Sequence, residues 1–131
     1  MSQEKVETVH RWFEALSDED FDAALALVHP EIEFVPPGGQ APYRGAESLR
    51  RWMEPDAFRR QVVEPLESVV VADRTVLTRQ HITAKGAGSG IELDLISWSV
   101  WTFDEDGLVT RVEVYLDHEQ DKARVAAGLL D

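Results

Sequence analysis

Apolar side chains spaced three and four residues apart predict a long helix at the start of the chain. The helix spans residues 3–16, and one of its faces carries Val6, Val9, Phe13 and Leu16. Polar and charged residues occupy the remaining positions, as is typical of a helix that packs on one side. We therefore expect this face to contribute to the protein core.

Two shorter helices and a strand are predicted next. Ser17 is expected to open the second helix by capping its free backbone N–H groups, and Pro30 is expected to end it. Alternating polar and apolar residues over 31–35 predict a short strand. A third helix is predicted from residue 46 to about residue 53.

The rest of the chain is dominated by strand patterns. The four predicted strands span residues 62–71, 75–84, 91–103 and 108–116. Pro65 cannot donate a ladder hydrogen bond, so the first of these strands is expected at a sheet edge or a bulge. Asp117 is expected to cap a closing helix. Helices gathered on one face of such a meander predict an α+β fold.

The third of the long strands carries large apolar groups on both faces. Leu95 and Trp101 share one face, and Ile96, Trp98 and Val100 share the other. One face can cover the core, but the other needs a second cover. A partner subunit is the economical choice, so we expect a homodimer formed through Ile96, Trp98 and Val100.

The composition is that of one globular domain, which we expect to cover residues 1–131. Hydrophobic residues make up 44% of the chain and charged residues 29%. Thirteen basic against 25 acidic residues give a net charge of −12, which disfavours nucleic acid and anionic membranes as partners. Cysteine, a signal-peptide pattern and a run of 18 apolar residues are all lacking, so we expect a cytoplasmic protein.

This order of elements and several local strings resemble the SnoaL-like branch of the nuclear transport factor 2-like superfamily. The similarity spans nearly the whole chain, and the matching strings are residues 11–16, 22–30, 43–45, 100–103, 107–109 and 114–117. The resemblance implies a cone, in which a curved mixed or antiparallel sheet wraps around the N-terminal helices and leaves a pocket at its open end. It does not specify an activity, because this fold hosts isomerases, hydrolases, dehydratases, cyclases and non-enzymatic binders.

The catalytic residues of family enzymes are matched incompletely. The ketosteroid isomerase positions align with Val35, Trp12 and Ser99, which supply neither the base nor the acids of that reaction. The epoxide hydrolase positions align with Arg79, His81 and Val114, so the arginine is kept while both acids are lost. Polyketide cyclases of the SnoaL type use a carboxylate or histidine in the same inner region, a role that His81 could fill.

The same alignment predicts a polar cluster on the concave face, formed by Arg79, His81, Ser97 and Ser99. His81 is the candidate for proton transfer, because an imidazole titrates near neutral pH. Arg79 is the candidate for holding an anionic oxygen or lowering the pKa of the histidine. The alternative is that Arg79 pairs with a nearby acid and His81 is a satisfied structural residue.

Aromatic residues are the candidates for an apolar ligand pocket, although such residues also build cores. With the two serines, the predicted ligand-binding set is Trp12, Phe34, Tyr43, Trp52, Ser97, Ser99 and Trp101. Tyr43 is expected near the mouth of the pocket. The four histidines lie on separate elements without metal-ligand spacing, so we predict neither a metal site nor a cofactor.

Two functions fit these patterns. The first is a cofactor-independent isomerase, cyclase, dehydratase or hydrolase that acts on an apolar organic molecule by acid–base chemistry. The second is a non-catalytic ligand-binding or dimeric scaffold domain. The polar residues Arg79 and His81 favour the first function, whereas the lack of a complete catalytic set favours the second.

Overall fold

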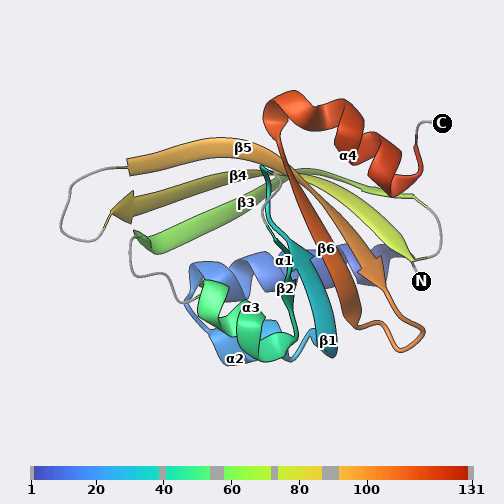
Figure 1. Ribbon diagram of the computed structural model, residues 1–131, viewed down its shortest axis with the longest axis horizontal. Coiled ribbons are helices and arrows are strands. Elements are labelled where there is room, and N and C mark those ends of the chain that lie inside the picture. The colour runs from blue at the N-terminus through green and yellow to red at the C-terminus, as the bar shows by residue number, and fades with distance from the viewer. Residues whose placement is uncertain (1, 39–40, 54–57, 72–73, 87–91, 130–131) are drawn as a thin grey trace.

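The computed structural model describes residues 2–38, 41–53, 58–71, 74–86 and 92–129, which form a curved sheet with helices on both sides (Figure 1). The elements are α1 (Ser2–Ser17), α2 (Phe21–Leu25), β1 (Val28–Val35), β2 (Tyr43–Arg44), α3 (Ala46–Met53), β3 (Phe58–Val70), β4 (Thr75–Gly86), β5 (Glu92–Phe103), β6 (Val109–Leu116) and α4 (Gln120–Ala127). A 3-10 turn, Asp117–Glu119, joins β6 to α4. The predicted α+β fold with a curved mixed sheet is confirmed.

The sheet has the strand order β2-β1-β6-β5-β4-β3. β1 and β6 run parallel, and all other neighbouring strands are antiparallel. β3 forms one edge, and its pairing with β4 is irregular between Pro65 and Glu67. The prediction that Pro65 marks an edge strand or a bulge is therefore confirmed, because the proline meets both conditions.

Helix α1 lies against the concave face of the sheet (Figure 1). Val9, Phe13 and Leu16 are buried in the main core, and Val6 packs against it. The rings of Trp12 and Phe13 both meet the ring of Trp101 edge-on, with centroid distances of 5.3 and 5.7 Å. The apolar face predicted for this helix is therefore confirmed.

The second helix is shorter than predicted, and its cap is a different residue. Asp20 precedes α2 and accepts a hydrogen bond from the backbone N–H of Ala23 at 3.2 Å. Ser17 instead ends α1, and its hydroxyl accepts from the backbone N–H of Val63 at 3.0 Å. The chain leaves the helix before Pro30, because Val28 already belongs to a strand that pairs with β6.

Helix α4 covers part of the outer face of the sheet (Figure 1). Ala123 and Ala127 pack against Leu77, Trp98 and Val100, and Trp98 and Val100 are only 3% and 1% exposed. The prediction of a second cover for this face is confirmed, but the cover over Trp98 and Val100 comes from the same chain. The expected dimer surface is wrong at these two residues, while Ile96 is half-buried. A homodimer itself stays a prediction.

The start of α4 is also organised differently from the prediction. Asp117 does not cap the helix; its Oδ1 accepts hydrogen bonds from Trp98 Nε1 at 3.2 Å and Arg79 Nε at 3.3 Å. Glu119 accepts from the backbone N–H of Leu116 at 3.0 Å, and this bond lowers the pKa of its carboxyl. Asp117 thus ties the outer sheet face to the turn before α4.

Candidate functional site

A cavity of about 230 Å³ lies between α1 and the concave face of the sheet. Most of its described lining side chains are aliphatic or aromatic, and the polar ones among them are one glutamine and two serines. The lining residues are Trp12, Phe13, Leu16, Phe34, Pro37, Val63, Gln80, Ile82, Leu93, Leu95, Ser97, Ser99, Trp101, Val112, Val114 and Leu116. A concave apolar site with few polar groups is typical of small-molecule pockets.

The polar groups of the cavity form one hydrogen-bonded chain across β4 and β5. Trp101 Nε1 donates to Ser99 Oγ at 2.7 Å, Ser99 Oγ donates to Gln80 Oε1 at 2.8 Å, and Gln80 Nε2 donates to Ser97 Oγ at 2.8 Å. Gln80 and Ser97 are direct cross-strand partners. All four side chains are buried, where polar groups need such partners.

Trp12, in α1, lines the cavity and has one polar side-chain atom, its indole nitrogen. Its side chain is 4% exposed, and its indole Nε1 is buried without a hydrogen-bond partner. A buried donor left without an acceptor costs about 1–3 kcal/mol. Trp12 Nε1 is thus an unused donor on a residue that lines the cavity.

The predicted ligand-binding residues are largely brought together. Those that line the cavity are Trp12, Phe34, Ser97, Ser99 and Trp101. Tyr43 lies in β2 and packs its ring against that of Phe34, at a centroid distance of 6.4 Å, but it does not line the cavity. Trp52 belongs to α3, and its side chain lies outside the described part of the chain.

The predicted catalytic pair lies on the opposite face of the sheet. Gln80 and Ile82 line the cavity, and side chains alternate along a strand, so Arg79 and His81 point to the outer face. Leu77 shares that face, where it packs with α4. The prediction that Arg79 and His81 face the pocket is therefore wrong by one residue in β4, whereas the inward positions predicted for Ser97, Ser99 and Trp101 in β5 are confirmed.

Both members of this pair have acidic partners on the outer face. Arg79 Nε donates to Asp117 Oδ1 at 3.3 Å, and its guanidinium lies 5.9 Å from the centre of the Trp98 ring. His81 Nε2 lies 2.7 Å from Asp94 Oδ1. This geometry matches the structural alternative, in which Arg79 pairs with an acid and His81 is satisfied.

Gln80 is the polar residue of the described lining that the sequence analysis missed. Two signals point to it. The series Val76, Thr78, Gln80 and Ile82 contains no ionisable residue, which favours the inner face, and Gln80 lies opposite Ser97, a residue that was placed correctly. The second signal requires the register between β4 and β5, which the local sequence does not provide.

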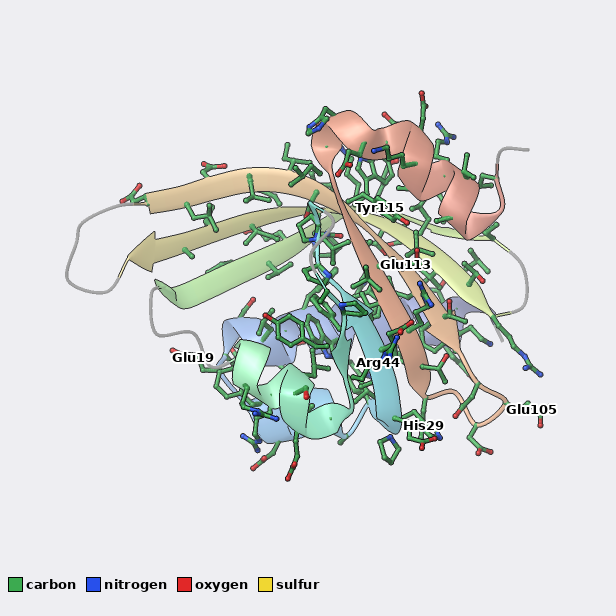
Figure 2. The ribbon with its side chains drawn as sticks, viewed as in Figure 1. Glu19, His29, Arg44, Glu105, Glu113 and Tyr115 are labelled. Atoms are coloured by element: carbon green, nitrogen blue, oxygen red, sulfur yellow. The ribbon has the colours of Figure 1, made fainter. Side chains whose placement is uncertain are left out.

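Charged residues instead gather on the outer face of β2, β1 and β6 (Figure 2). Glu33 accepts from Arg44 Nε at 3.1 Å and from Arg111 Nη1 at 2.5 Å, while Arg111 Nε donates to Glu113 at 3.1 Å. Tyr115 donates its phenol hydrogen to Glu113 Oε2 at 2.8 Å. Burial and the neighbouring Glu113 carboxylate raise the pKa of Tyr115 to about 12.

The described part of the cavity wall is uncharged. None of its described lining residues is ionisable. Within the described chain, no group of three His, Asp or Glu side chains is arranged to hold a metal ion. The polar chemistry that the cavity offers is therefore hydrogen bonding by indole, hydroxyl and amide groups.

The curved mixed sheet, the helices on its concave side and the cavity between them define a nuclear transport factor 2-like fold. Residues 9–112 match the family model of the SnoaL-like domain, so the chain belongs to the SnoaL-like family. The resemblance found in the local strings is thereby confirmed. A search of curated proteins found no match. No helix in the described residues is long and apolar enough to span a bilayer.

Solved structures share this fold at low sequence identity. SalBIII, an epoxide hydrolase/cyclase-like enzyme of pyran ring formation in the polyether salinomycin, is similar with a TM-score of 0.80 and 17% identity over 87% of this chain and 91% of its own. A SnoaL-like protein from Jannaschia sp. CCS1, assigned as a polyketide cyclase, is similar with a TM-score of 0.78 and 19% identity. The similarity covers 100% of this chain and 95% of that protein. Rv0760c from Mycobacterium tuberculosis, in complex with estradiol-17β-hemisuccinate, is similar with a TM-score of 0.76 and 13% identity. The similarity covers 86% of this chain and 92% of that protein.

Proposed function

We propose that this protein binds a small, apolar organic molecule in the cavity between α1 and the sheet. The observation that carries the proposal is the cavity: about 230 Å³, lined by aliphatic and aromatic side chains, with one hydrogen-bonded polar strip. Burial of a ligand's apolar surface supplies the affinity, and the polar strip supplies orientation.

The volume limits the ligand to a small one. Pockets for drug-sized ligands usually measure about 300–1,000 Å³, and an apolar cavity of about 150 Å³ can hold benzene. A cavity of about 230 Å³ lies between these cases. The ligand that fits it best is a molecule of roughly one or two rings.

The geometry favours binding over acid–base catalysis. A general acid or base has to lie within hydrogen-bond reach of the proton that it transfers. The described lining residues include no ionisable group, and Arg79 and His81 bond to Asp117 and Asp94 on the other side of the sheet. The described lining thus offers a ligand an apolar surface and hydrogen-bonding groups but no ionisable side chain that could act as a general acid or base.

A second candidate is a cyclase-type enzyme that folds a reactive substrate without donating or removing a proton. Its motivation is the similarity to SalBIII, which is an epoxide hydrolase/cyclase-like enzyme. An apolar cavity can accelerate ring closure by holding the reacting atoms close together, because the entropy of bringing them together is then lost on binding.

Ligand binding is tested by thermal denaturation with a panel of neutral molecules of one and two rings. A ligand at 100 times its Kd adds about 2.7 kcal/mol to the free energy of unfolding, which raises the Tm by several degrees. We expect Leu95→Trp to abolish the shift, because Leu95 lines the cavity and the larger indole fills it. His81→Ala is the matched control, and it should leave the shift unchanged.

Two results would count against binding in this cavity: a panel in which nothing raises the Tm, or a shift that survives Leu95→Trp. Mass spectrometry of the recovered ligand separates the two candidate functions. Unchanged ligand supports a binding protein, and an isomerised or cyclised product supports the enzyme.

A further inference from the structure

We infer that the cavity selects a neutral ligand bearing a hydrogen-bond-accepting oxygen, such as a ketone, ether or epoxide. This inference rests on the proposed function, because it names the class of ligand for the same cavity. It follows from counting the hydrogens that the buried polar groups have left to donate.

The chain of hydrogen bonds on β4 and β5 leaves one hydroxyl hydrogen unused. An indole N–H only donates, so Ser99 Oγ accepts from Trp101. Gln80 then accepts the hydrogen of Ser99 and donates an amide hydrogen to Ser97. The hydroxyl hydrogen of Ser97 has no acceptor among the described residues.

This count does not depend on the orientation of the Gln80 amide. Exchanging its oxygen and nitrogen would let Ser97 donate to Gln80 and would free the hydrogen of Ser99 instead. Both serines line the cavity, so either orientation leaves one hydroxyl donor in the wall. A ligand acceptor can satisfy that donor without disturbing the chain.

A second unused donor belongs to Trp12, a residue of α1 that lines the cavity opposite the sheet. Trp12 Nε1 is buried without a hydrogen-bond partner, although Trp12 lines the cavity. Buried N–H groups are rarely left without acceptors in native proteins, because the lost hydration is not replaced. A ligand that carries an acceptor oxygen can therefore supply a hydrogen-bond partner that the protein itself does not provide.

The absence of charge among the described lining residues disfavours ionised ligands. The described lining contains no Lys, Arg or His to pair with a carboxylate, and no Asp or Glu to pair with an ammonium group. Moving an unpaired charge from water into such a site is strongly unfavourable. The complementary ligand is neutral, apolar over most of its surface, and carries oxygen as an acceptor.

Three probes with one bicyclic skeleton test this inference: α-tetralone, tetralin and tetralin-α-carboxylic acid. We titrate each into the full chain and into the Trp12→Phe variant, following binding by calorimetry. Removing the indole N–H should weaken binding of tetralone by about 3- to 10-fold, the value of one net hydrogen bond, and leave tetralin within about twofold. The carboxylate should bind at least about tenfold more weakly than tetralone.

Trp98→Phe is the matched control, because its indole donates to Asp117 on the outer face rather than lining the cavity. Its affinities for tetralone and tetralin should equal those of the unmodified chain. A readout on the unmodified chain avoids any folding defect of the variants. The indole N–H resonance of Trp12 should move downfield with tetralone and not with tetralin.

The outcomes separate this inference from the proposed function. Binding of tetralin without tetralone, equal losses of both in Trp12→Phe, or tightest binding of the carboxylate would overturn the inference and leave the binding function standing. Failure of all three probes would count against the binding function and against the inference with it.

Discussion

The phenol of Tyr115 is the side chain whose chemistry the protein changes most clearly. Its hydroxyl donates to Glu113, which also bonds to Arg111 on the same outer strand face. Partial burial and the adjacent carboxylate disfavour a second negative charge, so the pKa of Tyr115 rises to about 12, above its ordinary value of about 10.

We predict that Tyr115 ionises only in strongly alkaline solution. The chain contains two tyrosines, so Tyr43→Phe leaves Tyr115 as the only phenol. Its tyrosinate absorbance should rise with a midpoint near pH 12. Glu113→Gln should move that midpoint towards the ordinary value of about 10, because it removes the carboxylate charge. A midpoint that Glu113→Gln leaves unchanged would contradict the assigned cause.

The sign of the effect on stability follows from the same shift. The unfolded chain loses the Tyr115 proton at about pH 10, and the folded chain holds it to about pH 12. The folded state therefore binds more protons between these values, and the free energy of unfolding falls as pH rises through this window. Below pH 10 the contribution is fully present.

The site residues on β5 could be predicted from the sequence, whereas those on β4 could not. The family alignment placed Ser97, Ser99 and Trp101 correctly on the inner face of β5, which the apolar pattern alone does not decide because both faces of this strand carry large apolar groups. On β4 both alternating series mix polar and apolar residues, so the pattern alone is weak. The alignment with epoxide hydrolases predicts Arg79 and His81 on the inner face. The simpler rule that ionisable side chains lie on the outer face predicts the position that they have in the structure.

At the scale of elements, α4 explains why the outer face of β5 does not need a partner at Trp98. Its contact residues are alanines, Ala123 and Ala127, which allow the helix to approach the sheet closely. The sequence predicted the need for a cover but not its source. A helix whose packing face consists of alanine has a weak apolar pattern, and its docking depends on tertiary contacts.

We predict that a charge at the α4 contact destabilises the protein strongly. Ala123 is 0% exposed and packs with Leu77, Trp98 and Val100, so Ala123→Asp would bury an unpaired carboxylate. The free energy of unfolding, measured by urea denaturation, should fall by about 2–4 kcal/mol. Val125→Asp is the control on the same helix, because Val125 is 53% exposed, and it should change stability by less than about 0.5 kcal/mol. Equal effects of the two variants would show that α4 does not dock as described.

At the scale of the whole molecule, the cavity makes the protein less stable than it would be with a fully packed core. Side chains around an unfilled space lose part of their dispersion contacts, and natural cores are otherwise close-packed. The cavity is bounded by α1, β1 and the inner faces of β3–β6, so the whole architecture contributes to it. The resemblance to the SnoaL-like family predicted this pocket. That its described lining carries no charge could be known only once the register between the strands was established.

Filling the cavity should therefore raise stability and remove binding together. Val114 is half-buried in the wall, and Val114→Phe places a ring in the space that the ligand would occupy. We expect the free energy of unfolding to increase by about 0.5–2 kcal/mol, as for other cavity-filling changes, while ligands of the panel no longer raise the Tm. Val125→Phe, on the exposed side of α4, should leave binding unchanged. A Val114→Phe protein that is less stable would mean that no free volume exists at Val114. Retained binding of the two-ring ligands would mean that they bind elsewhere, because a phenyl ring at residue 114 leaves too little of the roughly 230 Å³ for them.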